Sequence, residues 1–431
     1  MKPISVVILG AGSRGTRYAT HMNEAPECYR IVGMADPEEA RRKHFHERFG
    51  VPEEACFSHW REVLEQDKMA DVAVIATVDS MHYEAALMAI EKGYDILLEK
   101  PVAPTAQECA EIAAAAKKKG TRILVCHVLR YTPFYGKVKS LLDSGILGKV
   151  VSVDLVEAIE GVHFSHSYVR GNWHREEDSS PLLLAKSCHD LDIVQWLLGT
   201  RCQKVSSFGS LTHFVRENAP EGAPERCTDG TCPVGDTCPY NCIRHYHDWK
   251  QNSRRRIITR GISKEYTPTD EEVMKALRET DYGRCVYQMD NDVVDHQVVI
   301  MEFEGGVTAS FTLNPFNQGG RYIRVYGTKG ELFAHMKDTE ITVRLIGEKE
   351  VHTFPVSETQ ESIDGGHGGG DRGIIRELYQ YMSGHYEGNR AADIHVSVSN
   401  HLIGFAAEKA RRSSTVVSTQ DFEREIYSEI E

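Results

Sequence analysis

The stretch that decides the fold is Val6-Val7-Ile8-Leu9-Gly10-Ala11-Gly12-Ser13-Arg14-Gly15. Its first four residues are apolar and predict a buried strand, and the glycines that follow have the spacing G-x-G-x-x-G ahead of a helix-like segment. Gly10 permits a tight turn, Gly12 lets the backbone approach a pyrophosphate, and Gly15 lets helix and strand pack closely. The free N–H groups at the start of the helix would hold phosphates, so the stretch predicts a dinucleotide site. A glycine turn that binds nothing is the alternative.

Strand-like and helix-like segments alternate through the first 130 residues. The strand-like segments are Ile4–Leu9, Tyr29–Ala35, Val72–Thr77, Ile96–Glu99 and Arg122–His127. The helix-like segments between them are Arg14–Asn23, Glu38–Phe49, Tyr83–Lys92 and Ala106–Lys119. This alternation is typical of βαβ units and predicts a doubly wound parallel sheet, a Rossmann α/β domain over residues 1–130.

The pattern changes after about residue 148, where short strand-like segments follow one another. They are Lys149–Ala158, Asp295–Phe303, Gly306–Leu313, Tyr322–Gly327, Glu331–Met336 and Ile341–Leu345. Helices are expected over Leu182–Leu198, Asp371–Met382 and Ser397–Arg412. We therefore predict an α+β domain with an open, mostly antiparallel sheet over residues 131–412, interrupted by an insertion at about 217–290, and a C-terminal tail at 413–431.

Composition narrows the class of protein. The chain has 431 residues, of which 41% are hydrophobic and 26% charged, which fits a globular protein of two domains. A net charge of −13 argues against a nucleic-acid partner, which requires a basic face. No apolar run reaches about 18 residues, so no membrane span is expected. The N-terminus lacks the pattern of a signal peptide, and the cytoplasm is the expected compartment.

Asp36 bears on the choice of dinucleotide. It follows Gly15 by 21 residues, at the end of the second predicted strand. A carboxylate there hydrogen-bonds the ribose 2′-OH and repels a 2′-phosphate, so NAD is expected in preference to NADP. Arg41 and Arg42 lie nearby and weaken that preference. Asp36 as an ordinary solvated turn residue is the alternative.

Further motifs resemble a known family. The fourth predicted strand ends in Glu99-Lys100-Pro101, and four more segments agree in order and spacing: Thr77–His82, Leu129–Pro133, Gly145–Val150 and Ser187–Gly199. Together with the glycine turn, these are similar to the Gfo/Idh/MocA family (glucose–fructose oxidoreductase and inositol dehydrogenase). The resemblance implies that NAD(P) and substrate lie in a cleft between a Rossmann domain and an open-sheet domain. It implies cofactor contacts at Gly10, Ala11, Gly12, Ser13, Arg14, Gly15, Asp36, Thr77, Asp79, His82, Glu99 and Lys100.

The resemblance also implies a catalytic set. Oxidation of an alcohol by NAD needs a base for the hydroxyl proton, and His189 has the right titration range. Lys100 suits polarisation and proton relay. The family often has a carboxylate four residues before the histidine, where this chain has Ala185, while Lys186 stands three residues before it. On a continuous helix Lys186, His189 and Asp192 would share a face, so all three are candidates. A histidine packed inside a domain is the alternative for His189.

Substrate contacts are harder to predict. Arg170 and Trp173 lie in a segment that combines an aromatic ring with polar groups, which suits a sugar. Arg130 and Tyr131 are expected near the domain junction, and His367 stands in a glycine-rich loop. Each has an ordinary alternative as a loop, packing or surface residue.

Eleven cysteines are spread unevenly, and four of them cluster in the insertion. Cys227, Cys232, Cys238 and Cys242 have the spacing C-x4-C-x5-C-x3-C. The spacing is compatible with a structural zinc and equally with free thiols or disulfides, because it is not that of paired C-x-x-C knuckles. No catalytic metal is predicted, because hydride transfer to NAD does not need one.

These observations predict an NAD-dependent oxidoreductase that acts on a sugar, cyclitol or related polyol. One alternative retains and recycles NAD while a glycoside is hydrolysed or eliminated, and another is a non-catalytic NAD-binding sensor. The strand-like segments Val298–Phe303 and Thr308–Leu313 are rich in apolar residues. An apolar outer sheet face needs covering, so we expect a homodimer or homotetramer.

Overall fold

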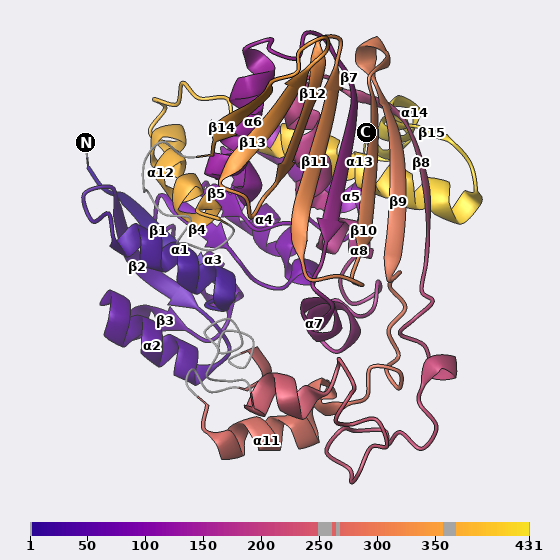
Figure 1. The fold of residues 1–431 in the computed structure, drawn as a ribbon. Helices are drawn as coiled ribbons and strands as arrows, with labels where there is room; N and C mark the ends of the chain where they lie inside the picture. Colours follow the sequence, from indigo (N-terminus) through magenta and orange to yellow (C-terminus); the bar gives the residue numbers. More distant parts are fainter. Residues whose placement is uncertain (1, 249–260, 264–267, 357–367, 431) are drawn as a thin grey trace.

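The computed structural model describes residues 2–248, 261–263, 268–356 and 368–430. Its named strands form two sheets that lie side by side, a six-stranded sheet in the N-terminal part and a nine-stranded sheet in the C-terminal part (Figure 1). Within the described ranges, every helix is too short or too polar to cross a membrane.

The first sheet is parallel throughout, in the order β3-β2-β1-β4-β5-β6. Its strands are β1 (Ile4–Leu9), β2 (Tyr29–Ala35), β3 (Cys56–Phe57), β4 (Val72–Ile75), β5 (Asp95–Leu98) and β6 (Ile123–Val125). Its helices are α1 (Ser13–Asn23), α2 (Glu39–Phe49), α3 (Trp60–Leu64), α4 (His82–Glu91) and α5 (Ala106–Lys119). This is the doubly wound order, which confirms the predicted fold class. The strand order reverses between β1 and β4, where such sheets bind ligands.

Local sequence explains where the key helices begin. In α5 the hydroxyl of Thr105 accepts the backbone N–H of Glu108, and the Glu108 carboxylate accepts the backbone N–H of Thr105. This capping box satisfies two N–H groups that the helix cannot pair itself. It anchors the chain directly after Glu99-Lys100-Pro101. The helix ends at Gly120, which has φ +69°.

The second sheet has the order β14-β13-β12-β11-β7-β10-β9-β8-β15. Its strands are β7 (Val150–Ala158), β8 (Cys202–Ser210), β9 (His296–Phe303), β10 (Thr308–Asn314), β11 (Gly320–Gly327), β12 (Gly330–His335), β13 (Glu340–Leu345), β14 (Val351–Pro355) and β15 (Val417–Ser418). Only β7 and β10 pair in parallel, so the expected mostly antiparallel sheet is confirmed. The sequence did not predict β8, whose serines and glycine give a weak strand signal. Pairing with β9 along most of its length holds it in the sheet.

Further α-helices among the described residues are α6 (Pro133–Asp143), α7 (Gly161–Phe164), α8 (Leu182–Ala185), α9 (Cys188–Leu198), α11 (Asp270–Glu279), α12 (Gly370–Met382), α13 (Ile394–Ser413) and α14 (Thr419–Ser428). The expectation of one continuous helix over Leu182–Leu198 is wrong. Ser187 has φ −106° and ψ 9°, and its carbonyl accepts the N–H groups of Asp190 and Leu191, so a new helix starts there. Lys186 therefore lies in the break between α8 and α9.

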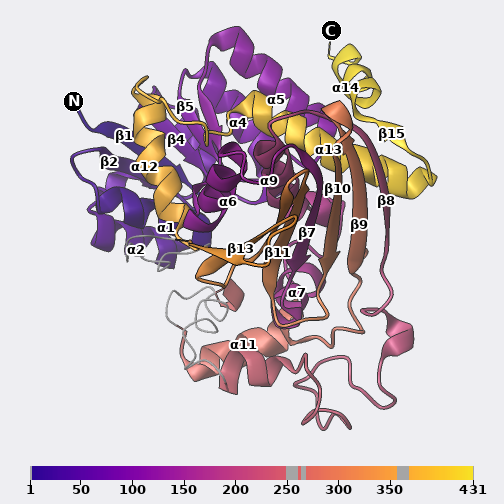
Figure 2. The same cartoon turned by 45° about the horizontal axis from the view of Figure 1, so that its top comes forward.

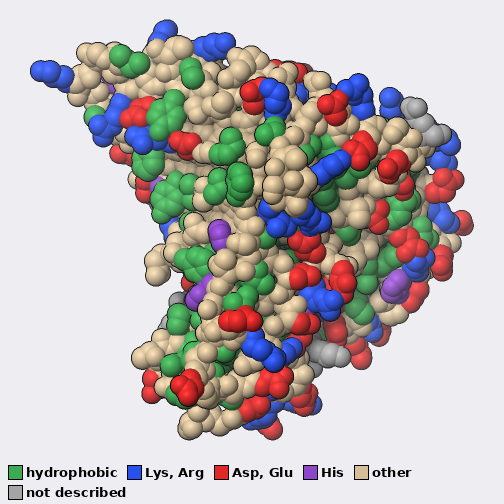
Figure 3. Space-filling model, turned by 90° about the vertical axis from the view of Figure 1, so that its right-hand side faces the viewer, with side chains coloured by type: hydrophobic (Ala, Val, Ile, Leu, Met, Phe, Trp, Pro, Cys, Tyr) green, Lys and Arg blue, Asp and Glu red, His purple; other side chains and the backbone are tan. Residues whose placement is uncertain are grey.

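The helices that contact the nine-stranded sheet all lie on one of its two faces. Helices α9, α13 and α14 pack against strands β7, β8 and β10 (Figures 1 and 2). By strand register, the opposite face carries the apolar residues Val156, Phe208, Val298, Ile300, Tyr322 and Phe333, interspersed with Ser310, Thr312 and the charged Asp154 and Arg324. Figure 3 shows that charged side chains crowd the right-hand half of the side it presents, while hydrophobic side chains are spread over the left-hand half.

The insertion contains α11 and lies at one end of the molecule (lower part of Figure 1). It has a small apolar cluster of its own, built by Cys242, Tyr246, Ile262, Val273, Ala276 and Leu277. Arg170 connects it to the chain that precedes α8, because the guanidinium donates to the carbonyl oxygens of Tyr240 (2.9 Å) and Arg284 (2.8 Å).

Candidate functional site

The glycine turn has the geometry that a dinucleotide site needs. Gly10 has φ +93°, and a Cβ there would lie 2.5 Å from the Ala76 carbonyl oxygen. A Cβ on Gly15 would lie 1.9 Å from the Gly10 carbonyl oxygen. A Cβ on Gly12 would meet no described atom within 4 Å, so the backbone is open to a ligand there. Among the described side chains none caps α1, which begins at Ser13, and an uncapped helix N-terminus suits an anion.

Asp36 closes this turn on the side of β2. Its Oδ2 atom accepts the backbone N–H of Ala11 at 2.8 Å, and its Oδ1 atom accepts that of Glu38 at 3.0 Å. The Arg41 guanidinium lies 3.4 Å from Oδ2, and Arg42 donates to the backbone oxygen of Asp36. The carboxylate is thus placed beside the phosphate turn, with two arginines at its outer side.

Arg14 and Glu99 form a buried polar cluster below the turn. Arg14 donates to Glu99 at 2.6 Å and to Asp371 of α12 at 2.8 Å, and the Tyr18 hydroxyl donates to Glu99 at 2.6 Å. Burial by itself would raise the pKa of Glu99, but the charges of Arg14 and Lys100 outweigh it and hold that pKa below its ordinary value. These residues tie α1, the end of β5 and α12 together.

The loop after β4 meets the second domain. The carboxylate of Asp79 accepts the indole N–H of Trp173 at 2.9 Å. Burial raises the pKa of Asp79, although the charges of His82 and Lys100 oppose the shift. His82 is buried, with ring nitrogens 2.8 Å from the Pro101 carbonyl oxygen and 3.2 Å from that of Thr77. It therefore links the loops after β4 and β5.

Lys100 crosses from the Rossmann domain to the second domain. Its Nζ atom donates to the carbonyl oxygen of Ala185, at the end of α8, at 2.7 Å. Its charge lowers the pKa of the neighbouring His127 and Lys186. His189, on the first turn of α9, has its ring edge-to-face with His127 at 5.9 Å between centroids. The structure thus brings Lys100, Lys186 and His189 into one neighbourhood around the helix break.

Lys186 faces a carboxylate that sequence reasoning missed. Its ammonium lies 3.5 Å from Glu157 of β7. Glu157 also pairs with Arg321 at 2.5 Å, and Arg321 holds Asp190 at 2.7 Å. Burial lowers the pKa of Lys186, and the nearby charges of Arg321 and Lys100 lower it further against the opposing effect of Glu157 and Asp190. Nothing local to Glu157 marked it in the sequence, because its partners come from 29 and 164 residues away.

Asp192 is placed differently from Lys186 and His189. It accepts two hydrogen bonds from Arg130, at 2.7 and 2.6 Å, and one from the Asn400 amide at 2.5 Å. Asp192 and these partners are buried. Burial raises the pKa of Asp192, although the charge of Arg130 opposes the shift. Arg130 and Asp192, predicted for substrate and catalysis respectively, are engaged with each other and hold α9 against the 3-10 turn at Val128–Tyr131.

His127 is a site residue that the sequence analysis did not select. It is buried between His189 and His401, with ring centroids 5.9 and 5.6 Å away. Burial, with the charges of Arg130 and Lys100, lowers its pKa well below the usual range. Neither ring nitrogen has a hydrogen-bond partner among the described atoms. A histidine at a strand end carries no signal of its own in one sequence, which explains the omission.

The other predicted substrate residues lie in several places. Tyr131 is buried and packs beside Gly373 of α12. Trp173 is held by Asp79, as described above, and Arg170 is engaged with the carbonyl oxygens of the insertion. His367 lies outside the described residues.

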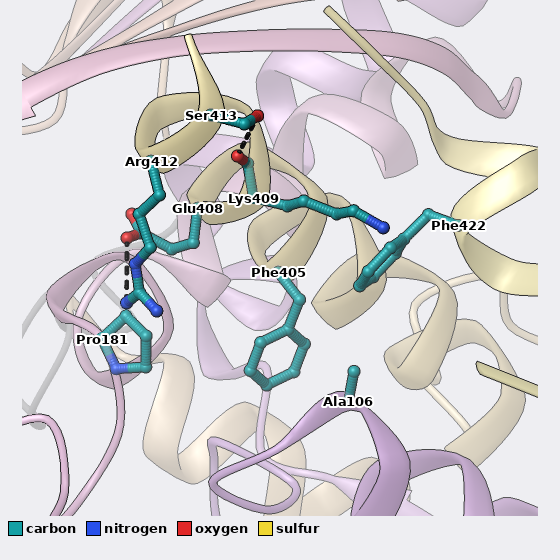
Figure 4. Close-up of a pocket in the computed structure, with 8 residues that line it drawn as sticks. All are labelled: Ala106, Pro181, Phe405, Glu408, Lys409, Arg412, Ser413 and Phe422. Atoms are coloured by element: carbon teal, nitrogen blue, oxygen red, sulfur yellow. Dashed lines mark hydrogen bonds and ion pairs between the residues drawn. The ribbon is translucent and has the colours of Figure 1, made fainter. Parts of the chain in front are cut away.

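Two further features bear on metal and ligand binding. In the part of the chain that the structure describes, which includes Cys227, Cys232, Cys238 and Cys242, no three His, Cys, Asp or Glu side chains are arranged to hold a metal ion. A pocket of about 450 Å³ lies among α13, α14 and the start of α5 (Figure 4). Its walls contain none of the predicted site residues: they are Ala106, Pro181, Phe405, Glu408, Lys409, Arg412, Ser413 and Phe422.

A dinucleotide turn on a Rossmann sheet, with a lysine that reaches the end of α8 beside the histidine-bearing helix α9 of an open-sheet domain, defines the class of two-domain NAD(P)-dependent oxidoreductases. Two family models match the chain. Residues 4–127 match the NAD-binding Rossmann fold of the GFO/IDH/MocA oxidoreductase family, and residues 139–419 match the C-terminal alpha/beta domain of that family. The chain belongs to this family.

Individual relatives are more distant. The oxidoreductase YteT of Bacillus subtilis (strain 168) is 26% identical over 84% of this chain and 83% of its own length. Inositol 2-dehydrogenase 2 of Saccharopolyspora erythraea is 27% identical over 46% of this chain and 54% of its own length. A solved structure of levoglucosan dehydrogenase, in complex with NADH and levoglucosan, superimposes with a TM-score of 0.69 over 97% of this chain and 99% of that one, at 16% identity. That likeness shows the shared fold.

Proposed function

We propose that the protein oxidises a CH–OH group of a sugar, cyclitol or related polyol, with NAD as hydride acceptor. The observation that carries the proposal is the path of Lys100, which leaves the carboxyl end of the nucleotide-binding sheet and reaches Ala185 beside the helix that bears His189. A donor and a base are thereby gathered where the two domains meet. The names of the relatives, inositol 2-dehydrogenase 2 and levoglucosan dehydrogenase, favour this substrate class.

The residues present fit the dinucleotide. The open position at Gly12 and the uncapped N-terminus of α1 suit the pyrophosphate, and Asp36 suits the adenine-side ribose. Asp36 favours NAD, because its carboxylate would repel the 2′-phosphate of NADP. NAD, when bound, supplies the hydride acceptor.

The chain's own side chains would handle the proton. His189 takes the proton of the reacting hydroxyl, and the Lys100 ammonium steadies the oxyanion that develops as the proton leaves. Lys186, with Glu157 beside it, adjusts the charge around His189. Asp192 and Arg130 bind each other and would orient α9.

The experiment is a screen of sugars, cyclitols and polyols with purified protein and NAD, in which the absorbance of reduced nicotinamide is followed. We expect one mole of NADH for each mole of substrate oxidised, and NADH formation slowed about a hundredfold or more with the Lys100→Ala variant. Conversion of a glycoside without accumulation of NADH would overturn net oxidation in favour of retained and recycled NAD. Tight NAD binding with no conversion of any compound in the screen would favour the sensor.

We also propose that the protein is a homodimer or homotetramer that covers the outer face of the nine-stranded sheet. Phe208 and Ile300 are 68% and 45% exposed on that face, and stable monomers rarely leave such surfaces open. Ile300→Glu should therefore give monomers in light scattering at micromolar concentration. Ile346→Glu, at an exposed apolar residue after β13, is the control that should leave the assembly intact. A monomeric wild-type protein would overturn the proposal.

A further inference from the structure

Two cysteines of the insertion converge on one backbone carbonyl. The backbone N–H of Cys227 donates to the Gly283 carbonyl oxygen at 2.9 Å, and the thiol of Cys242 lies 3.7 Å from the same oxygen. The two sulfur-bearing side chains are hydrogen-bonded to each other. Cys227 is half-buried and reachable from solvent, while Cys242 is buried in the apolar cluster of the insertion.

The two thiols differ in their electrostatic surroundings. The hydrogen bond from Cys242 and the guanidinium of Arg170 lower the pKa of Cys227 to about 6, although burial opposes the shift. The same hydrogen bond and burial raise the pKa of Cys242. The other thiols with resolved shifts at this site, Cys238 and Cys285, are half-buried, and burial raises their pKa values. Near neutral pH the site therefore holds one thiolate beside one thiol.

We propose that Cys227 and Cys242 form a peroxide-reactive thiol pair that closes to an intramolecular disulfide. The Cys227 thiolate attacks the O–O bond of a peroxide, which breaks to give a Cys227 sulfenic acid and, after a proton is taken up, water or an alcohol. The Cys242 sulfur then attacks the sulfenic sulfur, and the S–S bond forms as the sulfenic oxygen leaves with the thiol proton as water. The peroxide is reduced by two electrons and the two cysteines are oxidised by two.

Arg170 supplies the positive charge beside Cys227. Its side chain is buried and is held by the carbonyl oxygens of Tyr240 and Arg284, so its charge is fixed beside Cys227. A fixed cation beside an accessible thiolate is the environment that makes a cysteine reactive. The partner thiol within hydrogen-bond reach then traps the oxidised sulfur before further oxidation. The pair does not depend on the substrate or the cofactor of the oxidoreductase site.

The test treats the full-length protein with hydrogen peroxide, blocks remaining thiols with iodoacetamide and maps the disulfide by mass spectrometry. Trypsin cleaves after Arg226 and Arg244 and leaves four cysteines in one peptide, so a second protease that cuts before Asp229 and Asp236 is added. We expect residues 227–228 to be linked to residues 236–244, with a loss of two hydrogens that dithiothreitol reverses. No such link in the peroxide-treated wild type would overturn the proposal.

Variants decide which sulfurs react. Cys238→Ala should keep the link, and Cys242→Ala should lose it and leave a Cys227 sulfenic acid that dimedone captures. At pH 6 iodoacetamide should modify Cys227 at least about tenfold faster than Cys28 and Cys56, whose pKa values are raised. A link that survives in Cys242→Ala and disappears in Cys238→Ala, or equal alkylation of Cys227 and Cys28, would contradict the assignment.

Discussion

The phosphate turn and the cluster around His189 lie at the same end of the Rossmann sheet but are built in different ways. The turn is made by backbone, over six residues that are contiguous in sequence, Gly10–Gly15. The cluster is made by side chains from the segments that follow β5 and β6, from β7, from the break before α9 and α9 itself, and from β11 and α13, which come together only in the folded chain. The turn should therefore govern dinucleotide affinity, and the cluster should govern chemistry and stability.

The largest expected effect is on the stability of the cluster. Arg130→Met removes the partner of the buried Asp192 carboxylate and leaves a charge in the interior. Loss of one member of a buried pair destabilises a protein by about 3–5 kcal/mol, and thermal and denaturant unfolding would measure it. Arg122→Met, which breaks a more exposed pair with Asp95, is the matched control and should cost about 1 kcal/mol or less for that pair. Equal losses in the two variants would contradict the structural role of Arg130.

Chemistry should depend on the two side chains that the cluster presents. Lys100→Ala and His189→Ala should each lower kcat by about 10²-fold or more, the effect of losing a positioned acid or base. NAD affinity should change little, because the phosphates are held at the turn. Steady-state kinetics and calorimetry with NAD measure the two quantities separately. A Lys100→Ala enzyme that keeps the wild-type kcat would remove Lys100 from the mechanism.

Cofactor choice tests the edge of the turn. Asp36→Ala should narrow the difference between the Kd values for NAD and NADP by about tenfold, because the repulsion of the 2′-phosphate is lost and Arg41 and Arg42 remain. The two Kd values are compared in wild type and variant by fluorescence titration. A wild-type protein that clearly prefers NADP would show that the role assigned to Asp36 is wrong.

A further effect concerns the pH dependence of stability. Burial lowers the pKa of His401 to about 3 in the folded protein, whereas the same imidazole in the unfolded chain has a pKa near 6.5. Between these pH values the imidazole is neutral in the folded protein and protonated in the unfolded chain. His401 thus contributes full stability above about pH 6.5, and loses about 1.4 kcal/mol for each pH unit below it until pH approaches 3. In the His401→Gln variant the free energy of unfolding should fall less steeply between pH 6 and pH 4, by about 1.4 kcal/mol for each pH unit. His395→Gln, on the exposed side of the same helix, should leave the slope near that of wild type.

Features that depend on neighbours along the chain could be predicted from the sequence, and features that depend on distant partners could not. The G-x-G-x-x-G spacing and the alternating segments predict the Rossmann sheet, because both depend on neighbours along the chain. The prediction of one continuous helix failed at Ser187. The apolar spacing continues through this residue, but the Ser187 carbonyl accepts the first hydrogen bonds of a second helix, α9. Glu157 and His127 could not be found from one sequence, because their significance comes from distant partners such as Arg321 and His189.

The central claim is that the open backbone at Gly12 receives the dinucleotide, and one substitution tests it directly. Gly12 has φ −67°, and a Cβ added there would meet no described atom within 4 Å, so Gly12→Val should fold and unfold as the wild type does. Calorimetric titration with NAD should nevertheless show at least about tenfold weaker binding, a cost of about 1.4 kcal/mol or more from collision with the pyrophosphate. Lys100→Ala should bind NAD within about threefold of wild type, or about 0.7 kcal/mol. A Gly12→Val protein with wild-type NAD affinity would contradict the account.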